Sequence, residues 1–369
     1  MLTILPESIY RRQKCCVRWN SQNSEFFQVK NGVRQGAVVS PSLFCIYLDT
    51  LLSDLRKLGL GCHIGNTFVG AFGYADDVIL ISPTRHSLQL MLKTCEEFSH
   101  EHSMLFSTHN DPSKSKTKCQ YFSLTNKNGV PLKVLLNNDP LPWVDKAKHL
   151  GNDLTTKLNL GFKCLSTEQD LHVKRAIFFD RVHSIKQEFG YATPRIVCEI
   201  MRIYATSFYG SVLWELSSLD HQKLVRSWNS AVKMIWDLPY QTHTDFIEPL
   251  TNCPHLQQML HSRYIGFAKS LSMSEKQHTK LIYSLIKNDL TSLTGNNLKF
   301  LMNKYNNNTI EELFENRHVI AKENFKKMSS DDEWKIEVLE DLISFRDGRD
   351  ETELGKEEIE ESIFYVTTS

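Results

Sequence analysis

Apolar positions in the first part of the chain follow two different periods, which predicts short hairpins separated by helices. Residues 17–19 and 27–29 are apolar runs on either side of the polar stretch 20–24, as in a hairpin with a polar turn. From Pro41 the apolar residues recur at three and four positions as far as Leu58. This spacing predicts a helix, and Pro is well tolerated in a first helical turn.

The same alternation continues further along the chain. Residues 68–74 and 78–82 are β-rich runs that meet at Ala75-Asp76-Asp77, which predicts a second hairpin. Apolar residues between positions 88 and 98 recur at helical spacing and predict a second helix. Further short strands are expected at residues 104–106, 119–124, 130–136 and 143–150, the last two forming another hairpin.

Beyond about residue 160 the pattern becomes helical. An apolar stripe runs from Phe178 to Phe189, and Thr193-Pro194 starts a helix that is expected to reach Tyr209. Residues 224–235 form a further periodic stretch, and weaker ones follow to about residue 305. Three asparagines at residues 306–308 indicate a linker.

The amino-acid composition favours a globular, intracellular protein. Hydrophobic residues make up 41% and charged residues 23% of the 369, which is typical of a globular protein. Apolar runs are too short to span a bilayer, and the N-terminal stretch is too short for a signal peptide, so we expect an intracellular protein without a membrane partner. Nine cysteines without a framework spacing favour reduced thiols over disulfides.

Charge is distributed unevenly although the chain sums to zero. Residues 331–361 hold 14 acidic and 4 basic residues, a net charge of −10, so residues 1–330 carry +10. A basic body suits a polyanionic partner such as nucleic acid, and an acidic segment can compete for the same surface. The alternative is a solvated body with a disordered acidic tail, and charge alone does not separate the two.

Adjacent Asp76 and Asp77 are the first candidate for chemistry. They would place two carboxylates at a hairpin tip between apolar strands, and hard divalent ions such as Mg²⁺ prefer carboxylate oxygen. Phosphodiester synthesis uses two such ions to hold the attacking and leaving oxygens. The alternative is an ordinary turn, because Asp is common in turns.

The neighbouring residues favour the chemical interpretation. Residues 72–80, Phe-Gly-Tyr-Ala-Asp-Asp-Val-Ile-Leu, resemble the palm motif of reverse transcriptases in the form typical of non-LTR retrotransposons. Residues 31–44, Asn-Gly-Val-Arg-Gln-Gly-Ala-Val-Val-Ser-Pro-Ser-Leu-Phe, are similar to the preceding motif of that family, with matching order and separation. Weaker similarities follow at residues 106–122, 149–151, 174–176, 187–189, 209–214 and 228–232, so that the resemblance covers roughly residues 10–300.

This resemblance implies an RNA-directed DNA polymerase, a nucleotidyltransferase that uses Mg²⁺, an RNA template and a DNA primer. Asp76 would bind the catalytic metal ions, with Asp77 beside it. Lys116 would lie near the triphosphate, where a lysine acts as a mobile point charge. The alternative for Lys116 is a solvated basic loop.

The resemblance also implies a set of residues around the nucleotide and template. Tyr74 and Ala75 would lie near the primer end, and Gln35 and Gly36 against the incoming nucleotide and template base. A glycine suits position 36 in this role, because glycine lets the backbone approach a ligand closely. The full set implied is Arg34, Gln35, Gly36, Ser40, Tyr74 and Ala75. Trp143, Trp214 and Trp228 lie in patterned apolar stretches, which favours core packing over stacking on bases.

The implied fold class is α+β, with a partial palm of antiparallel sheet and helices followed by an all-helical, thumb-like region. The expected boundaries are a partial palm at residues 1–124, a connection at 125–160, a helical thumb-like region at 161–310 and an acidic, weakly structured tail at 311–369. Dense charge is the reason for expecting little packing in the last of these.

One departure from the family bears on activity. Such reverse transcriptases carry another metal-binding Asp before the motif at residues 31–44, whereas the first Asp of this chain is Asp49. The fingers and an endonuclease region are also not expected, as in a truncated element copy. Three interpretations stay open: a polymerase fragment inactive alone, a polymerase completed by an upstream segment, and a non-catalytic nucleic-acid-binding remnant. Zinc is not expected, because Cys253, His255 and His261 lack a complementary Cys pair.

Overall fold

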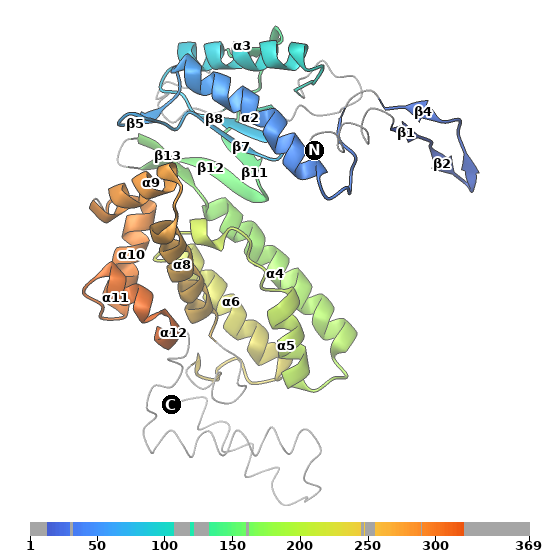
Figure 1. Ribbon diagram of the computed structural model, residues 1–369. Helices are drawn as coiled ribbons and strands as arrows, with labels where there is room; N and C mark the ends of the chain where they lie inside the picture. Colours follow the sequence, from blue (N-terminus) through green and yellow to red (C-terminus); the bar gives the residue numbers. More distant parts are fainter. Residues whose placement is uncertain are drawn as a thin grey trace, which may run out of the picture. The chain divides into compact units, whose positions relative to one another are not determined.

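The computed structural model describes residues 13–29, 32–106, 119–121, 133–159, 162–244, 247, 255–288 and 290–320 (Figure 1). The chain divides into two compact units, residues 1–144 and 145–369. Each unit combines antiparallel strands with helices around cores of its own, so the α+β class is confirmed.

The first hairpin of unit 1 is tighter than the sequence suggested. Strand β1 (Lys14–Cys15) pairs with β4 (Phe27–Gln28), and β2 (Arg18–Trp19) pairs with β3 (Gln22–Asn23). The turn is only two residues long, because Asn20 and Ser21 both adopt positive φ, 45° and 66°. That combination is the signature of a type I′ turn, whose twist matches that of the strands it joins.

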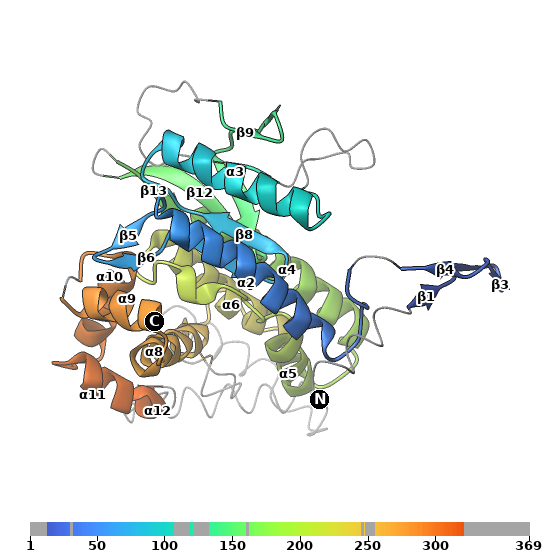
Figure 2. The same ribbon diagram turned by 45° about the horizontal axis from the view of Figure 1, so that its top comes forward.

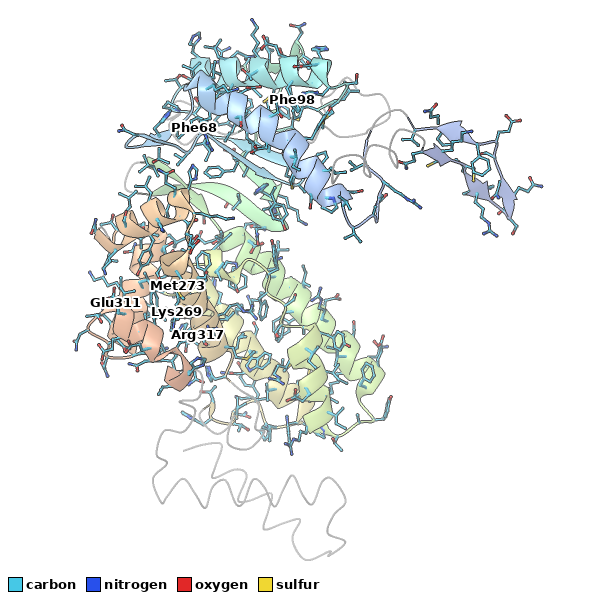
Figure 3. All side chains as sticks on the ribbon, viewed as in Figure 1. Phe68, Phe98, Lys269, Met273, Glu311 and Arg317 are labelled. Carbon is cyan, nitrogen blue, oxygen red and sulfur yellow. The ribbon has the colours of Figure 1, made fainter. Side chains whose placement is uncertain are left out.

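The main core of unit 1 lies between two helices and a hairpin. Helix α2 (Ser40–Leu58) packs against α3 (Arg85–Glu101) and against strand β7 (Ala71–Tyr74), which pairs with β8 (Asp77–Leu80). A smaller hairpin of β5 (His63–Ile64) and β6 (Thr67–Phe68) precedes it. Phe68 and Phe98, labelled in Figure 3, are part of this core. The helices and the hairpin expected here are therefore confirmed.

A second small core of unit 1 lies under α3, where β9 (Leu135–Leu136) pairs with β10 (Asp139–Pro140). The Gln89 side chain of α3 donates through Nε2 to the Leu135 carbonyl at 2.8 Å, and its Oε1 accepts from the Leu135 amide at 2.9 Å. The Gln89 side-chain amide thereby provides hydrogen-bond partners for both the N–H and the C=O of Leu135, as a neighbouring strand would.

Two strand predictions in this region were wrong. Residues 104–106 are irregular. Of the strand expected at residues 119–124 the structure describes 119–121, where Tyr121 forms an isolated bridge with Trp143. The described residues 133–136 do not pair with the stretch 143–150. A turn at Asn137 and Asn138, with φ of 52° and 65°, folds the first stretch back on β10 instead. Local turn chemistry therefore decided the pairing.

Unit 2 opens with a three-stranded antiparallel sheet in the order β11 (Lys146–His149), β12 (Asn152–Asn159) and β13 (Phe162–Ser166). Leu150 and Gly151 form the first turn with φ of 46° and 77°. Helical structure therefore begins at Glu168 rather than near residue 160, which corrects the expectation from periodicity.

The first helical core of unit 2 joins α4 (Glu168–Phe189), α5 (Pro194–Tyr204) and α6 (Leu219–Ile235), with a 3₁₀ turn η1 (Ser211–Leu213) between the last two. Trp214 and Trp228 are buried in it, so core packing of these two tryptophans is confirmed. Helix α5 ends five residues earlier than expected, because the following loop turns inward and buries Phe208.

The second helical core surrounds α8 (Leu256–Met273), as Figure 2 shows. It also contains α9 (Gln277–Asn288), α10 (Leu293–Lys304), α11 (Ile310–Glu315) and α12 (Arg317–Ile320). Leu313 and Ile320 are buried there, so residues 311–320 belong to the helical region and not to a weakly structured tail. The remainder of that predicted tail lies outside the described residues. Among the described helices, none is long and apolar enough to cross a membrane.

Candidate active site

The two candidate metal ligands lie at the tip of the β7–β8 hairpin. Tyr74 and Asp77 face each other across the strands, so Ala75 and Asp76 form the turn. Ala75 adopts a φ of 51°, in the left-handed region that costs a non-glycine residue free energy. The turn holds Asp76 and Asp77 side by side and exposed to solvent.

A glycine sets how closely this hairpin lies against α2. A Cβ atom placed on Gly73 would lie 3.1 Å from Leu48 Cδ2 and 3.3 Å from Leu52 Cδ1. Those distances are shorter than ordinary van der Waals contacts between carbon atoms. The strand therefore rests directly on α2 at this point, two residues before the turn, and the helix fixes the position of the hairpin tip.

Side chains alternate along a strand, so the neighbours of Gly73 point the other way. Phe72 and Tyr74 lie on the face turned away from α2, and 64% of the Tyr74 side chain is exposed. Asp77, which pairs with Tyr74, shares that face. The hairpin thus presents an aromatic surface next to its carboxylates.

The electrostatic situation of the tip favours a cation. Neither the Asp76 nor the Asp77 carboxylate makes an ion pair or a hydrogen bond to any of the described residues. Two adjacent carboxylates without a partner repel each other, and a divalent cation with oxygen preference would relieve that repulsion. In the described part of the chain, however, no third His, Cys, Asp or Glu completes a group able to hold a metal ion. The two carboxylates suit Mg²⁺ in kind but not in number.

The loop that precedes α2 is closed by a hydrogen bond from the first helical residue. Ser40 Oγ donates to the Arg34 carbonyl at 2.6 Å, and the Ala37 amide donates to the same carbonyl at 3.3 Å. Ser40 is only 4% exposed, so its hydroxyl holds the loop instead of facing solvent. Arg34 and Gln35 are exposed at the surface of that loop.

Gly36 stands at the exposed bend of the same loop. Its φ of 82° is a conformation that favours glycine, and no atom lies within 4 Å of a Cβ built on it. The backbone here is open to solvent, so a flat ligand could approach it without meeting a side chain of the loop.

The structure therefore brings the expected residues together as two local groups. Arg34, Gln35, Gly36 and Ser40 share the loop before α2, and residues 74–77 share the hairpin tip, with α2 packed against both the loop and the strand. Lys116 lies outside the described residues.

The remaining candidates from the sequence are the cysteines and the weak zinc site of Cys253, His255 and His261. Seven cysteines are free thiols, namely Cys15, Cys16, Cys45, Cys62, Cys95, Cys119 and Cys198. Burial, followed by Cys119 and Glu96, raises the pKa of Cys95 to about 12. Cys253 lies outside the described residues. His255 precedes α8, and His261 is buried, where its Nδ1 lies 2.8 Å from the Tyr305 hydroxyl.

Sequence reasoning missed a buried histidine pair in unit 2. His221 of α6 and His261 of α8 are 0% exposed, and their rings stack at 6.1 Å between centroids. Among the described residues, both ring nitrogens of His221 and Nε2 of His261 have no hydrogen-bond partner. The two residues are 40 positions apart, so no local pattern could have linked them.

One comparison with known proteins covers the stretch of chain that contains the hairpin and the loop. Residues 3–153 match the family model described as reverse transcriptase (RNA-dependent DNA polymerase). The Retrovirus-related Pol polyprotein from type-2 retrotransposable element R2DM of Drosophila melanogaster is 38% identical over 76 residues, which is 21% of this chain and 7% of that protein. The Retrovirus-related Pol polyprotein from type-1 retrotransposable element R2 of Nasonia vitripennis is 33% identical over 88 residues, which is 24% of this chain and 8% of that protein.

These matches confirm the resemblance inferred from the two motifs. Residues 3–153 are similar to reverse transcriptases, and the curated relatives that match are of the non-LTR retrotransposon type. The matched stretches span less than a tenth of the length of the curated relatives.

Proposed function

We propose, from the reverse transcriptase relationship of residues 3–153, that unit 1 carries part of an RNA-directed DNA polymerase palm and that unit 2 acts as its helical thumb. The observation that carries the proposal is the β7–β8 turn, which exposes two carboxylates beside an aromatic face, unpaired with any described residue. The loop before α2, with its open backbone at Gly36, is the proposed surface for nucleotide and template.

Each residue of the tip has a role in this proposal. Asp76 and Asp77 would hold Mg²⁺, which, when bound, aligns the attacking and leaving oxygens of phosphodiester formation. Tyr74 offers its exposed ring to the primer end, where stacking on a base is sequence-tolerant. Ala75 fixes the turn that keeps both carboxylates pointing outward.

The nucleotide side depends on the loop. Gly36 lets the backbone approach a base or sugar, and Gln35 supplies donor and acceptor groups beside it. Arg34 offers an exposed guanidinium for phosphate. Ser40 would act through the loop, because its hydroxyl is already donated to the Arg34 carbonyl. Lys116 is the proposed partner of the triphosphate.

We further propose that this chain on its own does not extend a primer. Two carboxylates leave most of the coordination sphere of Mg²⁺ to water, and Mg²⁺ dehydrates reluctantly. A third carboxylate from a segment that precedes the motif at residues 31–44 would complete the clamp. The alternative function, sequence-indifferent binding of RNA or DNA without chemistry, is favoured by the +10 charge of residues 1–330.

Primer extension on an RNA template tests the catalytic proposal. The purified chain should give background extension, and Asp76→Asn should leave that background unchanged. Adding an upstream palm segment in trans should restore extension, and Asp76→Asn should then abolish it. Asp54→Asn is the matched control, because Asp54 is an acidic residue of α2 that pairs with Lys57 at 2.9 Å. Extension by the chain alone that disappears in Asp76→Asn would overturn the proposal of an incomplete clamp.

Salt dependence tests the binding alternative. Affinity for an RNA or DNA oligonucleotide should fall steeply between low and moderate salt, because phosphate contacts release counterions. Removal of the acidic residues 331–361 should strengthen binding, since that segment competes with nucleic acid for the basic side chains of residues 1–330. An affinity that stays flat with salt would exclude the electrostatic explanation.

A further inference from the structure

Two arginines without an acidic partner line a hollow on the surface of unit 2. The hollow has a volume of about 480 Å³ and is lined by Met259, Ser262, Arg263, Gly266 and Arg317. The first four come from α8 and the last from α12, which packs against α8. Figure 3 labels Arg317, together with Lys269, which follows Gly266 by one turn on α8.

Backbone carbonyls hold both guanidinium groups in place. Arg317 Nε donates to the Ser262 carbonyl at 3.0 Å. Arg263 Nη1 lies 3.2 Å from Ser211 Oγ and within 3.5 Å of the Ser207 and Phe208 carbonyls. A guanidinium has five N–H donors, so each group keeps donors that these contacts do not use.

The position of the Arg317 guanidinium depends on a glycine of α8. A Cβ atom on Gly266 would lie 2.6 Å from Arg317 Cζ, so the guanidinium rests against bare backbone of α8. Any other residue at position 266 would displace it. The position of this charge is therefore set by the shape of α8.

The charge of the hollow is uncompensated. Over the described ranges, neither Arg263 nor Arg317 pairs with a carboxylate. Arg263 is half-buried, and this burial lowers its pKa. Fixed guanidinium groups with free donors match the bidentate geometry of phosphate oxygens.

We infer that Arg263 and Arg317 form a binding site for a phosphate of a nucleic-acid strand. The choice of nucleic acid rests on the proposed function, because template and primer are the phosphate polymers that a reverse transcriptase handles. Lys269, on the same face of α8, extends the positive charge along the path of the strand.

The experiment measures binding of a fluorescent 20-nucleotide oligothymidylate by anisotropy across a series of salt concentrations. The double variant Arg263→Gln and Arg317→Gln should bind roughly tenfold more weakly at moderate salt. Its salt slope should fall by about 0.7, since one phosphate contact is lost and each such contact on a single strand contributes about 0.7. Thermal melts of each variant check that unit 2 remains folded.

Two controls separate position from net charge. Gly266→Ala keeps both charges but displaces the Arg317 guanidinium, so it should weaken binding without changing the net charge. Arg202→Gln removes one positive charge from an exposed arginine of α5 that pairs with Glu199 at 2.7 Å, and it should change the slope little. An equal loss in Arg202→Gln and in the double variant would overturn the site, because generic charge would then explain the binding.

The outcomes also distinguish this site from the proposed function. If the wild-type chain binds the oligonucleotide and the double variant binds equally well, the site is refuted and the nucleic-acid function stands. If the wild-type chain binds no oligonucleotide at low salt, both are refuted. An unchanged slope together with faster proteolysis of residues 321–369 in the double variant would assign the hollow to the acidic segment instead.

Discussion

Acid should destabilise unit 2 through its buried histidine pair. His221 and His261 lie fully buried between α6 and α8, and three of their four ring nitrogens have no hydrogen-bond partner in the part of the chain that the structure describes. A protonated imidazole there would be a buried cation next to Lys304 and His255. We therefore expect both rings to stay neutral as long as the unit is folded.

The magnitude follows from the two pKa values. Burial, followed by Lys304, lowers the pKa of His221 from 6.5 to about 4. Burial, followed by Lys304, His221 and His255, lowers that of His261 to about 2. An unfolded chain takes up these protons as the pH falls below 6.5, whereas the folded unit does not, so stability is full above 6.5 and declines toward acid. At pH 5 each histidine should cost about 2 kcal/mol, and the pair about 4 kcal/mol.

Replacing one ring isolates this effect. In His221→Leu the unpaired ring nitrogens are gone, so stability at pH 7.5 should be unchanged or higher. The loss between pH 7.5 and pH 5 should shrink by about 2 kcal/mol, because only His261 remains to titrate. His183→Leu is the control, since His183 is an exposed histidine of α4.

Urea unfolding monitored by tryptophan fluorescence measures the change. Trp214 and Trp228 lie in the core to which α6 contributes, so their emission reports unfolding of this unit. Free energies at pH 7.5, 6.5, 5.5 and 5 give the slope for each variant. The reasoning is refuted if His221→Leu and the wild-type chain lose the same stability over this range.

Three further predictions concern packing and backbone. Gly73→Val should destabilise unit 1 by about 1–3 kcal/mol in urea unfolding, because the new side chain meets Leu48 at the surface of α2. An unchanged unfolding midpoint would mean that α2 moves to accommodate the valine without loss of stability. Trp214→Phe should cost unit 2 about 1–3 kcal/mol by thermal melting, because buried Asp170 loses the indole N–H that lies 2.9 Å from its Oδ2. Gly36→Ala should cost about 1 kcal/mol through left-handed backbone strain alone, and a larger loss would indicate a contact of the loop.

Periodicity was enough to locate the elements nearest the candidate site. The helix expected at residues 41–58 is α2, Ser40–Leu58, and the hairpin expected around Ala75-Asp76-Asp77 is β7–β8. Both succeed because one strong signal dominates each: a long apolar stripe in the helix, and two runs of strand-favouring apolar and aromatic residues around a short turn in the hairpin. The motif pair then pointed to the residues that the loop and the tip expose.

Errors arose where a local turn or a distant contact outweighed periodicity. Asn137 and Asn138 turn the chain back within a stretch that had been assigned to one strand. Residues 311–320 look charged and weakly structured in sequence, yet Leu313 and Ile320 pack against partners that precede them by tens of residues. The hollow between α8 and α12 has the same origin, because Arg263 and Arg317 meet only through tertiary packing.

The small β7–β8 sheet also affects how the protein behaves at high concentration. Among the described residues, Ala71–Tyr74 and Asp77–Leu80 pair only with each other, and Phe72 and Tyr74 are exposed on one face. Unpaired strand edges next to exposed aromatic rings serve as templates for a strand of another molecule, and a lone two-stranded hairpin is marginally stable. The exposed edge of the β7–β8 sheet, which could accept the proposed upstream segment, thus also favours self-association of the protein. Light scattering should therefore rise with protein concentration, and a peptide that pairs with this edge should prevent the rise.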